Sequence, residues 1–165
     1  ITDGQIYLES NLFHQGQRPA VNAGLSVSRV GSAAQTKAMK KVAGKLRLEL
    51  AQFRELQAFA QFSSDLDENT KRQIERGRRL TELLKQIDGE PLPFEEQVAV
   101  MYVAINGLID DIAVVQTQEF AAQFRNYLRK LCKHSVLEPL RTEGQLTDKT
   151  EAALKQAVEE FKNIK

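Results

Sequence analysis

The chain has 165 residues, 42% of them hydrophobic and 27% charged, which is ordinary for a globular protein with its own core. Its 23 basic and 22 acidic side chains leave a formal charge of +1, and this balance argues against nucleic acid as a partner. A single cysteine excludes an internal disulfide, and no apolar run is long enough to cross a membrane, so we expect no direct membrane insertion.

The first 31 residues have the pattern of strands and loops. Residues 5–8 predict one short strand, and Val21 with residues 25–27 predicts a second. Residues 13–19 predict a loop between them. A lone strand is unstable, so we expect strand partners outside the printed sequence. The chain also opens inside a predicted strand without a methionine, which suggests a fragment of a longer protein.

Arg29 lies between two turns of small residues, at 22–24 and at 31–32, just before a long helical pattern. Ser32, followed three residues later by Gln35, forms a capping-box pattern, so we expect the helix to begin at Ser32. A guanidinium on the constrained backbone before that helix is suited to binding an anion through its planar set of donors. A surface ion pair is the alternative that the residue type leaves open.

The remainder of the chain alternates helical patterns with short breaks. Apolar residues recur at steps of three and four, and Asp67 and Thr147 are expected to cap two of the helices. A break is expected near Pro139. These patterns predict a helical bundle behind a small β edge. The predicted helices cover residues 32–62, 68–87, 93–106, 117–131, 135–142 and 147–161.

The sequence contains no complete catalytic or metal site. It has no phosphate-binding loop of the G-x-x-x-x-G-K-[ST] type. Cys132 and His134 supply two of the four ligands that a structural metal site normally needs, so we expect no metal. Glu95 and Glu96 are adjacent and diverge on a helix, which favours a cap or a solvated face over an acid–base pair.

Six blocks carry a more specific signal: ITDGQIYL at 1–8, RPAVN at 18–22, GLSVSRVGSAAQ at 24–35, FAQFSSDLD at 59–67, LLKQ at 83–86 and EEQ at 95–97. In order and spacing they resemble the alpha subunit of the F-type ATP synthase, and the resemblance continues more weakly to the last helix. It implies the C-terminal third of that subunit.

The fold that the resemblance implies is mainly α. Residues 1–31 would be the C-terminal edge of the nucleotide-binding domain, a short β/loop remnant of an α/β domain with strand and arginine-finger loop. Residues 32–165 would be the C-terminal helical bundle domain.

The resemblance also implies chemistry contributed to a neighbouring subunit. In the family, the arginine that matches Arg29 reaches across the alpha/beta interface into the catalytic site of the beta subunit and acts there as an arginine finger. Phe13, Arg18, Pro19 and Gln86 match the adenine pocket of a regulatory, non-catalytic nucleotide site. The chain is therefore expected to be an inactive fragment of the non-catalytic alpha subunit of a rotary proton-translocating ATP synthase.

Two further features bear on this expectation. The family's second pocket glutamine, two positions after Gln86, is Asp88 here, so an amide donor to the adenine edge is lost. Residues 64–68 match an acidic loop that faces the central rotating stalk, although the same run reads equally as a helix cap.

The implied cofactor is ATP or ADP with Mg²⁺, whose metal ligands would lie outside this sequence, and we expect no tight nucleotide binding to this chain alone. The implied partners are the beta subunit, the gamma subunit of the central stalk and a delta-type subunit of the peripheral stalk. The implied location is the cytoplasmic face of a bacterial membrane or the matrix side of the mitochondrial inner membrane, and both are favoured over the thylakoid membrane. From the residues alone, a free-standing helical interaction module remains the alternative.

Overall fold

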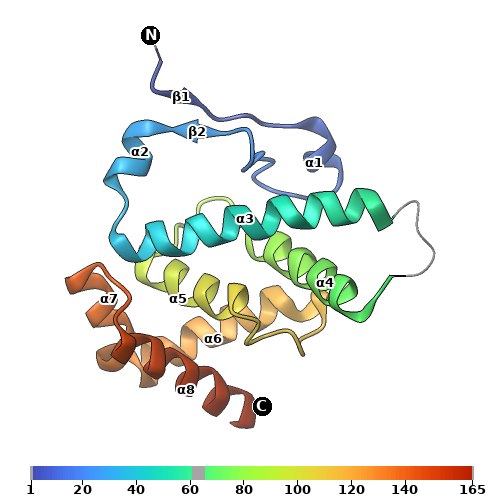
Figure 1. The fold of residues 1–165 in the computed structure, drawn as a ribbon. Coiled ribbons are helices and arrows are strands. Elements are labelled where there is room, and N and C mark those ends of the chain that lie inside the picture. Colours follow the sequence, from blue (N-terminus) through green and yellow to red (C-terminus); the bar gives the residue numbers. More distant parts are fainter. Residues whose placement is uncertain (1, 61–65, 165) are drawn as a thin grey trace.

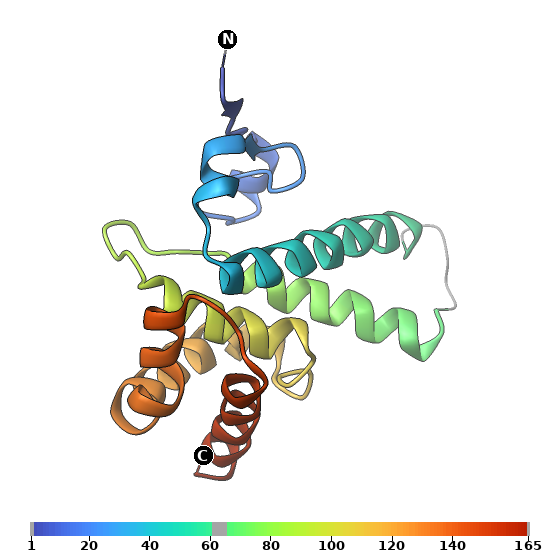
Figure 2. The ribbon, with the colours of Figure 1, turned by 60° about the vertical axis from the view of Figure 1, so that its left-hand side comes forward.

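The computed structural model describes residues 2–60 and 66–164. A small N-terminal layer lies above a helical bundle, with α3 directly beneath the layer (Figures 1 and 2), so the predicted mainly α fold is confirmed. The elements are β1 (Gly4–Gln5), α1 (Ser10–His14), β2 (Val27–Ser28), α2 (Arg29–Ala34), α3 (Lys37–Ala60), α4 (Glu68–Leu83), α5 (Phe94–Ile105), η1 (Val114–Gln116), α6 (Thr117–Leu131), η2 (Lys133–Leu137), α7 (Glu138–Glu143) and α8 (Asp148–Ile164).

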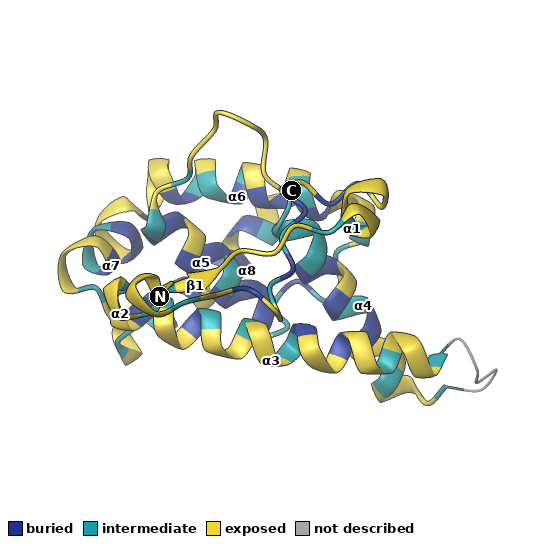
Figure 3. Ribbon diagram, turned by 90° about the horizontal axis from the view of Figure 1, so that it is seen from above, coloured by how far each residue is buried: buried dark blue, intermediate teal, exposed yellow. Residues whose placement is uncertain are grey.

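The N-terminal layer contains two strands of two residues each, which overlap the predicted strands only at Gln5 and Val27. β1 and β2 pair antiparallel, and an isolated bridge joins Leu8 to Val21. The predicted loop at 13–19 is wrong at its start, because Phe13 belongs to α1, whose last turn directly precedes the chain reversal at Gly16. β1 and the outward turns of α3 are exposed (Figure 3).

The helix predicted to begin at Ser32 is two helices, and the predicted capping box is wrong. The hydroxyl of Ser28 accepts a hydrogen bond from the backbone N–H of Gly31 at 2.9 Å and caps α2, which begins at Arg29, three residues before Ser32. The hydroxyl of Thr36 accepts from the N–H of Met39 at 3.2 Å, which begins α3. Ser32 therefore lies inside a helix. The domain boundary expected between residues 31 and 32 stays a prediction.

The second predicted helix begins as expected but ends early. The carboxylate of Asp67 accepts from the N–H groups of Asn69 and Thr70, at 2.9 and 3.0 Å, which confirms this cap. Hydrogen bonds from Thr70, the hydroxyl first, hold the pKa of Asp67 below its usual value. α4 ends at Leu83, and Ile87, the last residue of the predicted helix, lies outside it and is 69% exposed.

The later helices follow the pattern with smaller corrections. Thr147 accepts from the N–H of Thr150 at 3.3 Å, as predicted for the start of α8. Pro139 does not interrupt its helix, because it lies in the first turn of α7, where a missing N–H costs nothing. The irregular stretch comes earlier, as the π-helical turn η2. Leu131, the last residue of α6, is 70% exposed.

Helix α5 is the centre of the bundle and packs against α3, α4, α6, α7 and α8. Glu95 and Glu96 in its first turn are each only 4% exposed, so the prediction of a solvated face is wrong. They do diverge, and each reaches a different arginine: Arg141 of α7 and Arg129 of α6. Burial is tolerated because both carboxylates are paired.

Among the described residues, none of the helices is both long and apolar enough to cross a membrane.

Candidate functional site

Arg29 is the first residue of α2, at the end of the N-terminal layer opposite α1 (Figure 1). Its side chain is 70% exposed. The guanidinium donates to the backbone carbonyls of Thr2 at 3.0 Å and Asp3 at 3.3 Å, and its Nε lies 3.9 Å from the Asp3 carboxylate. These bonds use Nε and Nη2 and orient the planar group at a solvent-facing edge.

Asp3, which the sequence analysis did not single out, holds the backbone around this arginine. Its carboxylate accepts from the N–H of Val30, at 3.0 and 3.1 Å, and from the hydroxyl of Ser28 at 3.0 Å. Its carbonyl accepts the N–H of Arg29. One acidic residue thus ties β1 to the start of α2, where its negative charge also interacts favourably with the helix dipole. The Asp3-Gly4 pair, which is typical of a turn, was the sequence feature that could have pointed to Asp3.

A second cluster forms where the N-terminal layer meets the segment between α4 and α5. The backbone N–H of Gln86 donates to the carbonyl of Arg18 at 2.8 Å. An open pocket of about 700 Å³ lies at this junction. Its wall includes Arg18, Pro19, Gln86 and Asp88, with Ile87, Gly89, Glu90 and Pro91 completing the lining.

Phe13, predicted to belong to the same pocket, is not part of its lining but contacts Arg18, which is. The guanidinium of Arg18 lies 4.3 Å from the centre of the Phe13 ring, which is cation–π distance. The side-chain amide of Gln86 donates to the carbonyl of Glu90 at 3.0 Å and so fixes the turn that carries Asp88. Three residues predicted together, Arg18, Pro19 and Gln86, therefore line one pocket, whereas Arg29 belongs to a separate edge.

Other predicted features have different outcomes. Of the acidic run at 64–68, residues 64 and 65 lie outside the described residues. Within the described part of the chain, no group of three or more His, Cys, Asp and Glu side chains is arranged to hold a metal ion. Cys132 is buried, and burial raises the pKa of its thiol.

Comparison with protein families gives a match over residues 35–161, to the ATP synthase alpha/beta chain, C-terminal domain. The matched segment runs from two residues before α3 into the last turn of α8, so it covers the helical bundle and begins after Arg29. The helical domain built around α5 is accordingly that of an ATP synthase chain, and the protein belongs to the ATP synthase alpha/beta family.

Proposed function

We propose that this chain is the C-terminal part of the regulatory, non-catalytic alpha subunit of a rotary proton-translocating ATP synthase. Two features support the alpha type within the family: the exposed Arg29 at the start of α2 and the Arg18–Gln86 pocket. The observation that carries the proposal is Arg29, oriented by backbone carbonyls yet 70% exposed at an edge.

Arg29 would act in trans as an arginine finger. A transferring phosphoryl group spreads negative charge over its oxygens, and a guanidinium brought to it by a neighbouring subunit stabilises that charge. The anchoring to Thr2 and Asp3 presets the direction of the side chain, so less freedom is lost when the interface closes. The exposed β1–β2 edge, including Val27, which is 50% exposed, supports a continuation of the sheet outside this sequence.

The pocket at Arg18 would hold the base of a regulatory ATP or ADP. Arg18, in contact with Phe13, and Pro19 offer one wall, and the turn held by Gln86 offers the other. Mg²⁺ and the phosphates would be held by residues outside the sequence. Asp88 presents an acceptor where the family has an amide, which suits the exocyclic amino group of adenine rather than a ring acceptor.

The proposed partners are the beta subunit at the Arg29 edge, the gamma subunit of the central stalk and a delta-type subunit of the peripheral stalk. The complex would lie on the cytoplasmic face of a bacterial membrane or the matrix side of the mitochondrial inner membrane. A free-standing interaction module is less well supported, because the matched family consists of ATP synthase chains.

The decisive experiment is Arg29→Lys in a reconstituted complex that contains this chain within its subunit. Lysine keeps the charge and loses the planar fork, so assembly should persist while multisite ATP hydrolysis falls by roughly a thousandfold or more. Arg47→Lys, an exposed arginine of α3, is the matched control and should leave turnover unchanged. Wild-type turnover in the Arg29→Lys complex would contradict the proposal.

A further inference from the structure

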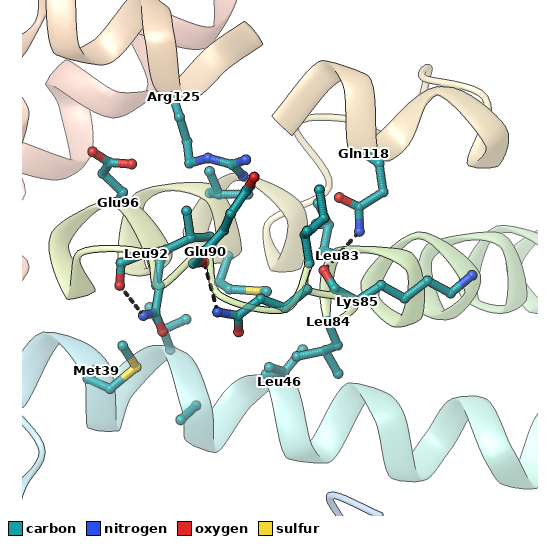
Figure 4. A pocket seen from close by; sticks show the side chains of 17 residues that line it. Met39, Leu46, Leu83, Leu84, Lys85, Glu90, Leu92, Glu96, Gln118 and Arg125 are labelled. Atoms are coloured by element: carbon teal, nitrogen blue, oxygen red, sulfur yellow. Dashed lines mark hydrogen bonds between the residues drawn. The ribbon is translucent and has the colours of Figure 1, made fainter. Parts of the chain in front are cut away.

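A second pocket lies on the other side of the segment that joins α4 to α5. It has a volume of about 560 Å³ and is enclosed by α3, α5, α6 and that segment (Figure 4). Small-molecule sites typically measure roughly 300 to 1,000 Å³ and are mainly apolar with a few polar groups. The lining is of this kind: Met39, Ala43, Leu46, Leu84, Val100 and Met101 supply much of the wall.

The amide side chains around this pocket are used internally. Gln86 donates to the carbonyl of Glu90 at 3.0 Å, and Gln97 donates to the carbonyl of Leu92 at 2.7 Å (Figure 4). Gln118 donates to carbonyls at the end of α4 and at Lys85. These bonds hold the connecting segment in place beside the pocket. They use both donors of the Gln118 amide and one donor each of Gln86 and Gln97.

The charged side chains of the pocket wall differ in whether they have an ion-pair partner. The carboxylate of Glu96 is held by Arg129 through two hydrogen bonds, and Lys85 is paired with Glu82. Arg125 of α6 is half-buried at the same pocket, and within residues 2–60 and 66–164 no hydrogen bond or ion pair engages its guanidinium. Burial lowers the pKa of Arg125, and the carboxylates of Glu96 and Glu90, which line the same pocket, act in the opposite direction.

A half-buried guanidinium that has no hydrogen-bonded or ion-paired partner, beside an apolar cavity, is stabilised when it binds an anion. We propose that this pocket binds a small amphipathic carboxylate of the fatty-acid class, with the chain in the cavity and the carboxylate on Arg125. The pocket adjoins the proposed nucleotide pocket, with which it shares Gln86, Ile87 and Glu90, but the proposal does not depend on the alpha-subunit assignment.

The test uses the 165-residue chain and isothermal titration with octanoate, decanoate and decanol below their aggregation concentrations. Decanoate should bind saturably, and each added methylene should tighten binding about fourfold, which is the burial free energy of one methylene converted to affinity. Decanol, which lacks the charge, should bind at least about tenfold more weakly than decanoate.

Two variants locate the site. Arg125→Gln should weaken decanoate at least about tenfold and leave decanol unchanged, whereas Lys130→Gln, an exposed lysine on the same helix, should bind as wild type. Ala43→Phe should fill the cavity and abolish binding of both ligands, with circular dichroism to verify the fold; Ala43→Leu serves the same purpose if the phenylalanine variant does not fold. Equal affinity for decanoate and decanol, no saturable binding, or an Arg125→Gln variant that binds decanoate as wild type would overturn the proposal.

Discussion

Arg129 of α6 holds the buried carboxylate of Glu96 through two parallel hydrogen bonds, Nε to Oε1 at 2.6 Å and Nη2 to Oε2 at 2.7 Å. The hydrogen bonds that Arg129 donates to the Glu96 carboxylate raise the pKa of Arg129. One turn of α5 is thus clamped to α6, and the neighbouring Glu95 clamps it to α7 through Arg141, at 2.6 and 2.9 Å. Helix α5 is therefore fixed by charge pairs as well as by apolar packing.

We expect Glu96→Gln to destabilise the chain by about 2 kcal/mol, below the value for fully buried pairs because Arg129 is itself half-exposed. Urea denaturation would measure the free energy of unfolding. Glu75→Gln is the control, since its pair with Arg78 is exposed on both sides, and the change should stay within about 0.5 kcal/mol. Equal effects of the two substitutions would show that the Glu96–Arg129 pair contributes no more to the free energy of unfolding than an exposed pair does.

Gly77 marks the closest approach of α3 and α4. It is buried, and a Cβ added there would fall within the ring of Phe53. Gly77→Ala should therefore cost about 1 to 3 kcal/mol through overpacking, despite the better helix propensity of alanine. At Gly44 of α3 an added Cβ meets nothing within 4 Å, so Gly44→Ala should stabilise by about 0.5 to 1 kcal/mol. Thermal unfolding of both variants checks the opposite signs.

Burial, together with its hydrogen bond to Glu151 at 2.9 Å, raises the pKa of Tyr102 to about 12 from an ordinary value of 10.0. Because the folded-state pKa exceeds the unfolded one, this contribution to stability is complete below pH 10 and is lost as pH rises toward 12.

In Tyr102→Phe the loss of stability over that interval should be smaller than in the wild type, although the variant is less stable at neutral pH because the hydrogen bond is gone. Denaturant unfolding at a series of alkaline pH values measures the difference between the two slopes. Parallel slopes would mean that Tyr102 titrates normally in the folded chain.

Asp88 stands in the proposed nucleotide pocket where the family has a glutamine. If the Arg18–Gln86 pocket holds a regulatory nucleotide, Asp88→Gln should increase the nucleotide retained at non-catalytic sites of a reconstituted complex, because it restores an amide and removes a negative charge from the pocket. Asp111→Asn, an exposed acid outside this pocket, removes a charge elsewhere and should change nothing. Bound nucleotide after gel filtration is the measurement, and lower retention by Asp88→Gln would contradict the assigned pocket.

Local patterns predicted the regular elements well where a helix has one apolar face. The start of α4 at the Asp67 cap and the start of α8 at Thr147 follow from short-range hydrogen bonding, which the sequence encodes directly. Ser32 failed as a cap because the chain forms two helices in this region, and Ser28 and Thr36 cap them instead. The extended backbone at Ser28 is a tertiary feature that the local pattern does not reveal. The resemblance supplied residues that periodicity would not have grouped, such as Arg18 with Gln86.

The sequence by itself determined the helical class, the succession of helices and the family, because these depend on periodicity, caps and blocks of residues that lie close together along the chain. Only the tertiary structure decided that Glu95 and Glu96 are buried, that Asp3 anchors Arg29 and that Arg125 faces an apolar cavity without a direct partner. The reason is that burial and charge pairing join residues tens of positions apart, and the free energy of a charge depends on which of those partners the fold brings to it.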